Sequence, residues 1–273
     1  MTANITGIAI YQGMATALDT LCAQGYGSGR KDLVGLYFQR MALLLLALTL
    51  PISLLWWNSG SILEHIVPDL KTAELAGTYL RVLILGAPGY ALFESGKRFV
   101  LAQGIYHATT YILLIAAPFN VLMNWLLVWK LNFGFHGAPL ASAITNNILP
   151  MMLLFYVWRV DGQSCWNGVS RKAFDGWGEM VSLAIPGMMM LLSEYLAFEV
   201  LTLAASHFST TQLAAQSIIS PLVALTFQLP LALGIVSSTQ VANQIGAGLA
   251  SRARQIAQVS DDKLVGLSLT DIE

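Results

Sequence analysis

Charged residues are scarce in this chain of 273 residues: they make up 11% of it, against roughly 25% in ordinary soluble domains. Together with 56% apolar residues and a mean hydropathy of +0.64, this scarcity excludes a soluble domain that faces water on all sides. Cysteine is also rare. Cys22 lies in a predicted helix and Cys165 in a predicted loop, which argues against a disulfide or a metal site. The sequence has no HExxH, GxSxG or paired-cysteine motif, so we expect no enzyme.

Long apolar stretches occupy most of the chain. Each is close to the roughly 20 residues that a helix needs to cross the hydrocarbon core of a bilayer. They predict an all-α polytopic membrane protein of about seven transmembrane helices, at residues 3–24, 38–58, 74–98, 106–130, 136–158, 179–206 and 212–244.

The basic residues fall mainly on one side of the predicted membrane. Ten of the fourteen follow odd-numbered helices, and the positive-inside rule assigns these loops to the cytoplasm. The first helix then starts outside without a charged lead segment, and the chain after Ala257 is short and polar. We therefore expect a chain truncated at both ends. Because the basic residues are scattered among short loops, we expect no nucleic-acid partner.

Two segments of the chain are faintly alike. Residues 17–29 and 236–248 share a threonine, an alanine and two glycines at a constant offset, and Gln24 is matched by Asn243. Each segment ends an apolar helix and leads into a basic stretch. A repeated helix end in a membrane chain is typical of a transporter with duplicated halves.

Four stretches resemble one known family in order and spacing. They read GMATALDTLCAQGYGSG (13–29), PFNVLMNWLLVWKLNFGFHGAPLASAIT (118–145), AIPGMMMLLSEYLAFEVLTLAA (184–205), and QLAAQSII (212–219) followed by STQVANQIGAG (238–248). They resemble the multidrug and toxic compound extrusion (MATE) transporters of the eukaryotic branch. The resemblance implies helices two to eight of a twelve-helix, two-lobe fold.

The resemblance also implies a division of the chain into four parts. Residues 1–160 would form most of the N-terminal lobe, without its first helix, and residues 161–178 the cytoplasmic loop between the lobes. Residues 179–257 would form the first two helices of the C-terminal lobe, and residues 258–273 a polar tail. One departure is Ser220-Pro221, which stands where the family often carries a Tyr-Glu pair. No role of that glutamate is carried over.

Two carboxyl groups at predicted membrane depth are the main candidates for substrate and proton binding. Glu194 and Glu199 lie in the middle of the sixth predicted helix, far in sequence from any basic residue. Charges at this depth are costly, and desolvation favours the neutral form of a carboxyl group. Such a group can take up a proton and release it when a cation arrives. Five residues of helix place the two side chains about 140° apart, so we expect one to face the cavity and the other to support it.

Other polar residues give less decided predictions. Tyr195 is a candidate aromatic wall for a flat organic cation. Asp19 is either a latch between helices or a substrate contact, with the latch favoured. Asn120 and Asn124 share a helix face and either line a cavity or join helices. Gln24, in the first repeated segment, completes the candidate cavity or gate residues. Separately, Glu94 has basic residues three and four positions later, which predicts a local ion pair near the interface.

The predicted function is that of a proton-coupled antiporter that exports organic cations, drugs or xenobiotics. The resemblance implies no cofactor, a proton rather than sodium as coupling ion, a monomer in the lipid bilayer, and a plasma-membrane or vacuolar (endomembrane) location. The alternatives are a flippase for lipids or lipid-linked oligosaccharides, for which we would expect a more cationic cavity, and an inactive fragment of a transporter.

Overall fold

The computed structural model describes residues 2–64, 70–208 and 210–270. These residues form helices and turns, without a strand among them. The elements are η1 (Asn4–Ile8), α1 (Ala9–Ala15), α2 (Ala17–Gly27), α3 (Lys31–Trp57), α4 (Ser59–Glu64), α5 (Leu70–Leu83), η2 (Ile84–Gly86), α6 (Ala87–Ala102), α7 (Tyr106–Trp125), η3 (Leu126–Lys130), η4 (Gly134–His136), α8 (Gly137–Arg159), η5 (Gln163–Cys165), η6 (Arg171–Phe174), α9 (Trp177–Phe208), α10 (Thr210–Gly246) and α11 (Ala250–Thr270).

Six helices of the described chain are long and apolar enough to cross a membrane, and they correspond to six of the seven predicted helices. The exception is the first prediction, residues 3–24. Here η1, α1 and α2 follow one another, with a break at Thr16, and none of the three reaches a membrane-spanning length alone. The Thr16 hydroxyl donates a hydrogen bond to the carbonyl of Gly13 at 2.6 Å, and the backbone bonds around Thr16 join residues three apart while its dihedral angles stay helical. At the other end, the predicted polar tail 258–273 begins inside α11, which is helical as far as Thr270.

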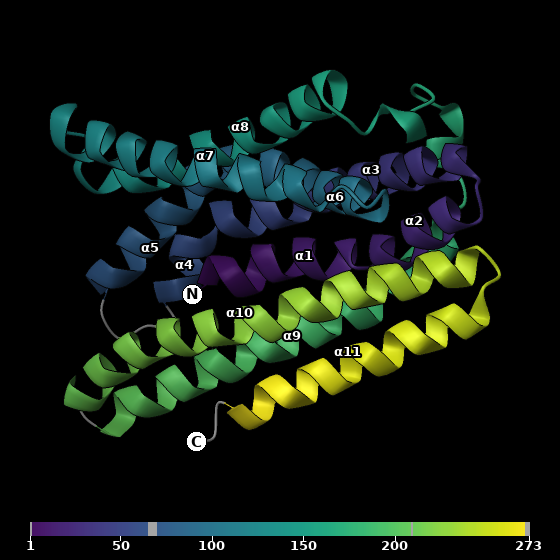
Figure 1. Cartoon of the computed structure of the whole chain (residues 1–273). Coiled ribbons are helices and arrows are strands. Elements are labelled where there is room, and N and C mark those ends of the chain that lie inside the picture. Colours follow the sequence, from purple (N-terminus) through teal and green to yellow (C-terminus); the bar gives the residue numbers. More distant parts are fainter. Residues whose placement is uncertain (1, 65–69, 209, 271–273) are drawn as a thin grey trace.

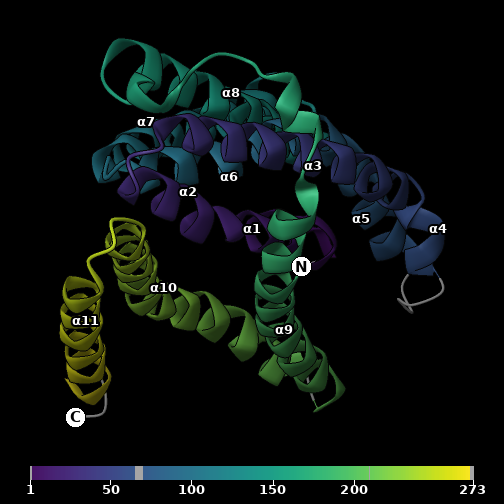
Figure 2. The same cartoon turned by 90° about the vertical axis from the view of Figure 1, so that its right-hand side faces the viewer.

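The helices form two groups on opposite sides of α1 and α2 (Figures 1 and 2). Helices α3, α5, α6, α7 and α8 lie together on one side, where α6 packs on both α3 and α8 and α7 packs on α8. On the other side, α9 packs on α1 and α10 packs on α2, with α11 beside α10 (Figure 2). The short helices α1 and α2 therefore lie between the two groups and contact both.

Small residues allow close helix packing inside the first group. A Cβ added at Gly89 of α6 would lie 2.7 Å from the Cα of Asn147 in α8, and one added at Gly86 would lie 2.7 Å from the Cα of Ala143. Close backbone approach at small residues is the usual way in which helices associate in lipid. The outer face of α7 is apolar and exposed, with Leu114 66% accessible, as expected for contact with lipid chains.

Polar side chains attach η1, α1 and the loop before α9 to the first group. Trp56 near the end of α3 donates from Nε1 to the Thr6 hydroxyl at 2.8 Å, and Tyr11 donates to the Thr49 hydroxyl at 3.0 Å. The loop between α8 and α9 is attached to α3 through Gln39, whose Nε2 donates to the carbonyl of Gly168 at 2.7 Å. The loop that precedes α9 is therefore fixed to the first group.

Candidate functional site

The two predicted carboxyl groups lie on α9, and both Glu194 and Glu199 are half-buried. The helix passes through Pro186 without ending, and its run of methionine and leucine residues favours the helical state. None of the ion pairs between described residues involves either glutamate. Neither glutamate therefore has a cationic side chain as partner in the described chain.

Tyr195, next to Glu194, is tied to the first helix group. Its hydroxyl donates to Gln12 Oε1 of α1 at 3.2 Å, and Gln12 Nε2 donates to the hydroxyl of Tyr90 in α6 at 2.7 Å. We had predicted Tyr195 as an aromatic wall for a cation. The structure adds a second role for its hydroxyl, as one end of a hydrogen-bonded chain from α9 through α1 to α6.

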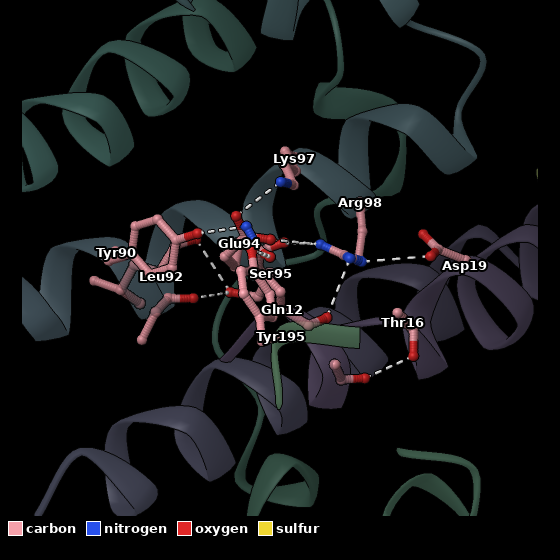
Figure 3. A network of polar contacts seen from close by, with 12 residues as sticks. Gln12, Thr16, Asp19, Tyr90, Leu92, Glu94, Ser95, Lys97, Arg98 and Tyr195 are labelled. Carbon is pink, nitrogen blue, oxygen red and sulfur yellow. Dashed lines mark hydrogen bonds and ion pairs between the residues drawn. The ribbon is translucent and has the colours of Figure 1, made fainter. Parts of the chain in front are cut away.

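A group of four charged residues lies beside this chain, and we call Asp19, Glu94, Lys97 and Arg98 the Arg98 cluster; Glu94 and Arg98 are buried, and Lys97 is partly exposed (Figure 3). Glu94 accepts from Lys97 Nζ through Oε1 and from Arg98 Nη1 through Oε2, both at 2.7 Å. The side chains of Glu94 and Arg98 are only 2% and 7% accessible. The predicted pairing of Glu94 with residues three and four positions later is therefore present, and Glu94 and Arg98 are buried between helices.

Asp19 joins the cluster from α2. Its Oδ2 lies 3.4 Å from Arg98 Nε, so α2 and α6 are connected by charge (Figure 3). Nothing among the described residues donates a hydrogen bond to Asp19 Oδ1. The Asp19 carboxylate thus faces an arginine of a neighbouring helix, and its favoured role as a latch between helices stays a prediction.

Asn120 and Asn124 lie between α7 and α8. Asn120 Nδ2 donates to the Thr145 hydroxyl at 2.9 Å, and Asn124 Nδ2 donates to Asn120 Oδ1 at 3.0 Å. Both amides are half-buried and hydrogen-bonded within the first helix group. Of the two roles left open for them, this geometry fits the joining of helices.

Gln24 lies where the two repeated segments meet. A Cβ added at Gly27 would lie 3.0 Å from the Cα of Asn243, and one added at Gly246 would lie 2.8 Å from the Cα of Gln24. Gly27 corresponds to Gly246 in the repeat, and Gln24 corresponds to Asn243. The two segments therefore pack reciprocally, each glycine against the other segment's amide residue, which is the pattern of a two-fold interface.

A cavity of about 450 Å³ adjoins this contact. Thr20 and Gln24 of α2 line it on one side, and residues of α10 and α11 line the other, among them Ser237, Ser238 and Ser260. Gln24 thus contributes to a cavity wall, but one at the α2–α10 contact, whereas the hydrogen bond of Tyr195 leads to α1 and Gln12.

Sequence reasoning did not select Gln12, Tyr90 or the combination of Asp19 with Arg98. Gln12 carried a usable signal, since it is a glutamine within a predicted apolar helix and its amide must find partners there. The contacts of Gln12 could not be predicted, because the partners lie far apart in the sequence: Gln12 and Tyr195 are 183 residues apart.

Comparison with known proteins gives consistent matches. The chain is 44% identical over 274 residues to an uncharacterized transporter of Saccharomyces cerevisiae, with 100% of this chain and 38% of the relative covered. It is 33% identical over 253 residues to multidrug and toxin extrusion protein 2 of Mus musculus, with 92% and 44% covered. The chain thus spans about half the length, or less, of these relatives.

A solved structure supports the same assignment. The eukaryotic MATE transporter AtDTX14 superposes with a TM-score of 0.88 at 28% identity, over 95% of this chain and 58% of that one. The MatE family model matches residues 1–126 and 186–269. This chain therefore belongs to the MATE family of membrane transporters.

Proposed function

We propose that the protein of which this chain forms at least a part is a proton-coupled antiporter that exports organic cations. The observation that carries the proposal is the pair of half-buried glutamates on α9, which have no basic partner in the described chain. The relatives named for multidrug and toxin extrusion support export as the direction of transport.

The carboxyl chemistry explains how exchange would occur. In a site of low polarity, a nearby cation stabilises the carboxylate form. When no cation is present, the neutral carboxyl group is favoured. Proton binding at Glu194 would therefore release an organic cation, and cation binding would release the proton. Tyr195 and Phe198 add aromatic rings on the same helix, which favour a flat cation.

The two helix groups fit the lobes of an alternating-access transporter. In this proposal residues 1–160 belong to one lobe, residues 179–257 to the other, and residues 161–178 join them. Rocking of one lobe against the other would then carry the substrate across the membrane. We propose that the transporter is a monomer and that it lies in the plasma membrane or a vacuolar membrane. The alternative, a flippase for lipids or lipid-linked oligosaccharides, is less favoured because the unpaired charges on α9 are acidic and both cations of the Arg98 cluster are paired.

Binding of ethidium, a planar organic cation, tests the proposal on the purified chain in lipid nanodiscs. We expect Glu194→Gln to lower ethidium affinity at least tenfold and to abolish its decrease on acidification, since the glutamine has no proton to gain. Glu179→Gln is the matched control, because Glu179 lies in the first turn of the same helix and is exposed. Wild-type ethidium affinity in Glu194→Gln would exclude the assigned role.

A further inference from the structure

Gln12 joins three helices. Its Oε1 accepts from Tyr195 of α9, its Nε2 donates to Tyr90 of α6, and its backbone carbonyl accepts from Arg98 Nη2 at 3.2 Å. Figure 3 shows Gln12 between Tyr90 and the Arg98 cluster. Gln12, which Tyr195 contacts, is therefore also bonded to α6 twice, through its side chain and through its backbone carbonyl.

Glycines bring α1 and α9 into backbone contact at the same junction. A Cβ added at Gly13 would lie 3.0 Å from the backbone nitrogen of Met188, and one added at Gly187 would lie 2.9 Å from the carbonyl oxygen of Gly13. These contacts fix how closely the helices approach. They also favour one face of α9 towards α1, because a side chain in place of Gly187 would collide with Gly13 and Thr16.

The hydrogen bond from Tyr195 to Gln12 adds a second attachment between α9 and α1. Tyr195 lies seven residues, about two helical turns, beyond Met188, so the second attachment is well separated from the glycine contact. Two separated attachments, one steric and one polar, define the rotation of α9. A shift of one residue around the helix would turn its side chains by about 100°.

We propose that Gln12 is a positioning residue that sets the direction of the Glu194 and Glu199 carboxyl groups. Glu194 adjoins Tyr195, and Glu199 follows Tyr195 by four residues and so lies on the same helix face. Gln12 transmits the position of α6 and its Arg98 cluster to α9 through these bonds. The inference rests on the proposed function only in taking Glu194 and Glu199 as the cation and proton site.

Distance measurement between two spin labels tests the geometry without a ligand. One label replaces Met190 on α9 and the other replaces Leu54 on α3, both exposed, in a chain with Cys22 and Cys165 changed to alanine. We expect Gln12→Met and Tyr195→Phe each to shift and broaden the distance distribution. The double variant should change it no further, because both single changes remove the same bond.

Ser193→Ala is the matched control. Ser193 also donates a hydrogen bond on α9, but to Met189 of its own helix at 2.8 Å, so its loss should leave the distribution unchanged. Distributions of Gln12→Met and Tyr195→Phe that coincide with that of the unmodified sequence would overturn the inference. A shift of equal size in Ser193→Ala would also overturn it, since the effect would then belong to helix stability.

Ethidium binding separates this inference from the proposed function. If Gln12 orients the carboxyl groups, Gln12→Met and Tyr195→Phe should each weaken ethidium binding about fivefold, which corresponds to about 1 kcal/mol. If both variants bind like the unmodified chain while Glu194→Gln does not, the positioning role is refuted and the proposed function stands. If Glu194→Gln binds normally and the distances still shift, the proposed function fails and Gln12 orients α9 for another purpose.

Discussion

Replacing Arg98 by methionine should destabilise the protein by about 3–5 kcal/mol, the range found when one partner of a buried ion pair is removed. Arg98 is the only ion-pair partner of Asp19 among the described residues and one of two partners of Glu94. In Arg98→Met, Asp19 keeps a buried charge without a countercharge, and Glu94 keeps only Lys97. The low accessibility of these carboxylates means that water cannot replace the lost interaction.

The double variant Asp19→Asn with Arg98→Met makes the reasoning specific. It removes one charge of each sign, so the remaining pair of Glu94 and Lys97 is neutral. We expect it to regain more than half of the stability lost in Arg98→Met, because the penalty comes from the uncompensated charge and not from the missing attraction.

Thermal unfolding of the purified chain in detergent provides the measurement. A loss of this size corresponds to a decrease in unfolding temperature of about 10 °C for a domain of roughly this length. Arg254→Met is the control, since Arg254 is exposed on α11, and it should change the stability by less than about 0.5 kcal/mol. An unfolding temperature of Arg98→Met equal to that of Arg254→Met, or a double variant no more stable than Arg98→Met, would refute the argument.

Two further predictions concern packing. Gly246→Ala should destabilise the contact of α2 with α10 by about 1–3 kcal/mol, because the new methyl group meets the backbone of Gln24, which cannot rotate away. Gly234→Ala in the same helix meets no atom within 4 Å and should stabilise α10 by about 0.5–1 kcal/mol; thermal unfolding that ranks the two variants equally would contradict this. Trp56→Phe should cost about 1–3 kcal/mol, because the Thr6 hydroxyl loses its donor and the core loses ring area, and an unchanged unfolding temperature would disprove it.

Helix number and extent were predictable because they depend on local composition. A run of apolar residues long enough to span the bilayer is visible in any window, and six such runs are helices of the expected length. The change to backbone bonds between residues three apart at Thr16 was not visible, because the apolar residues continue on both sides of it. No hydrophobic pattern records that event.

The candidate site was predictable only in part, for a related reason. Spacing on one helix predicted that Glu94 pairs with Lys97 and Arg98. It gave no indication that Asp19 lies opposite Arg98, because that contact depends on how α2 packs against α6. The repeated segments predicted a relation between two halves, whereas their reciprocal packing through glycine required the helices to be placed in space.

The distribution of strong and weak contacts indicates where the protein is expected to move. One of the three ion pairs between described residues, that of Asp19 with Arg98, joins α2 to α6, and the other two lie within α6. Across the junction with α9 and α10 the structure has glycine contacts, the bond from Tyr195 to Gln12, and a bond from Asn243 Nδ2 to the carbonyl of Ala102 at 3.4 Å, none of which involves a charged group. Separating backbones at glycines breaks short-range dispersion contacts and exposes no charge, so it costs less than separating a buried ion pair. We therefore expect α1 and α2 to stay with the first helix group when the two groups move apart.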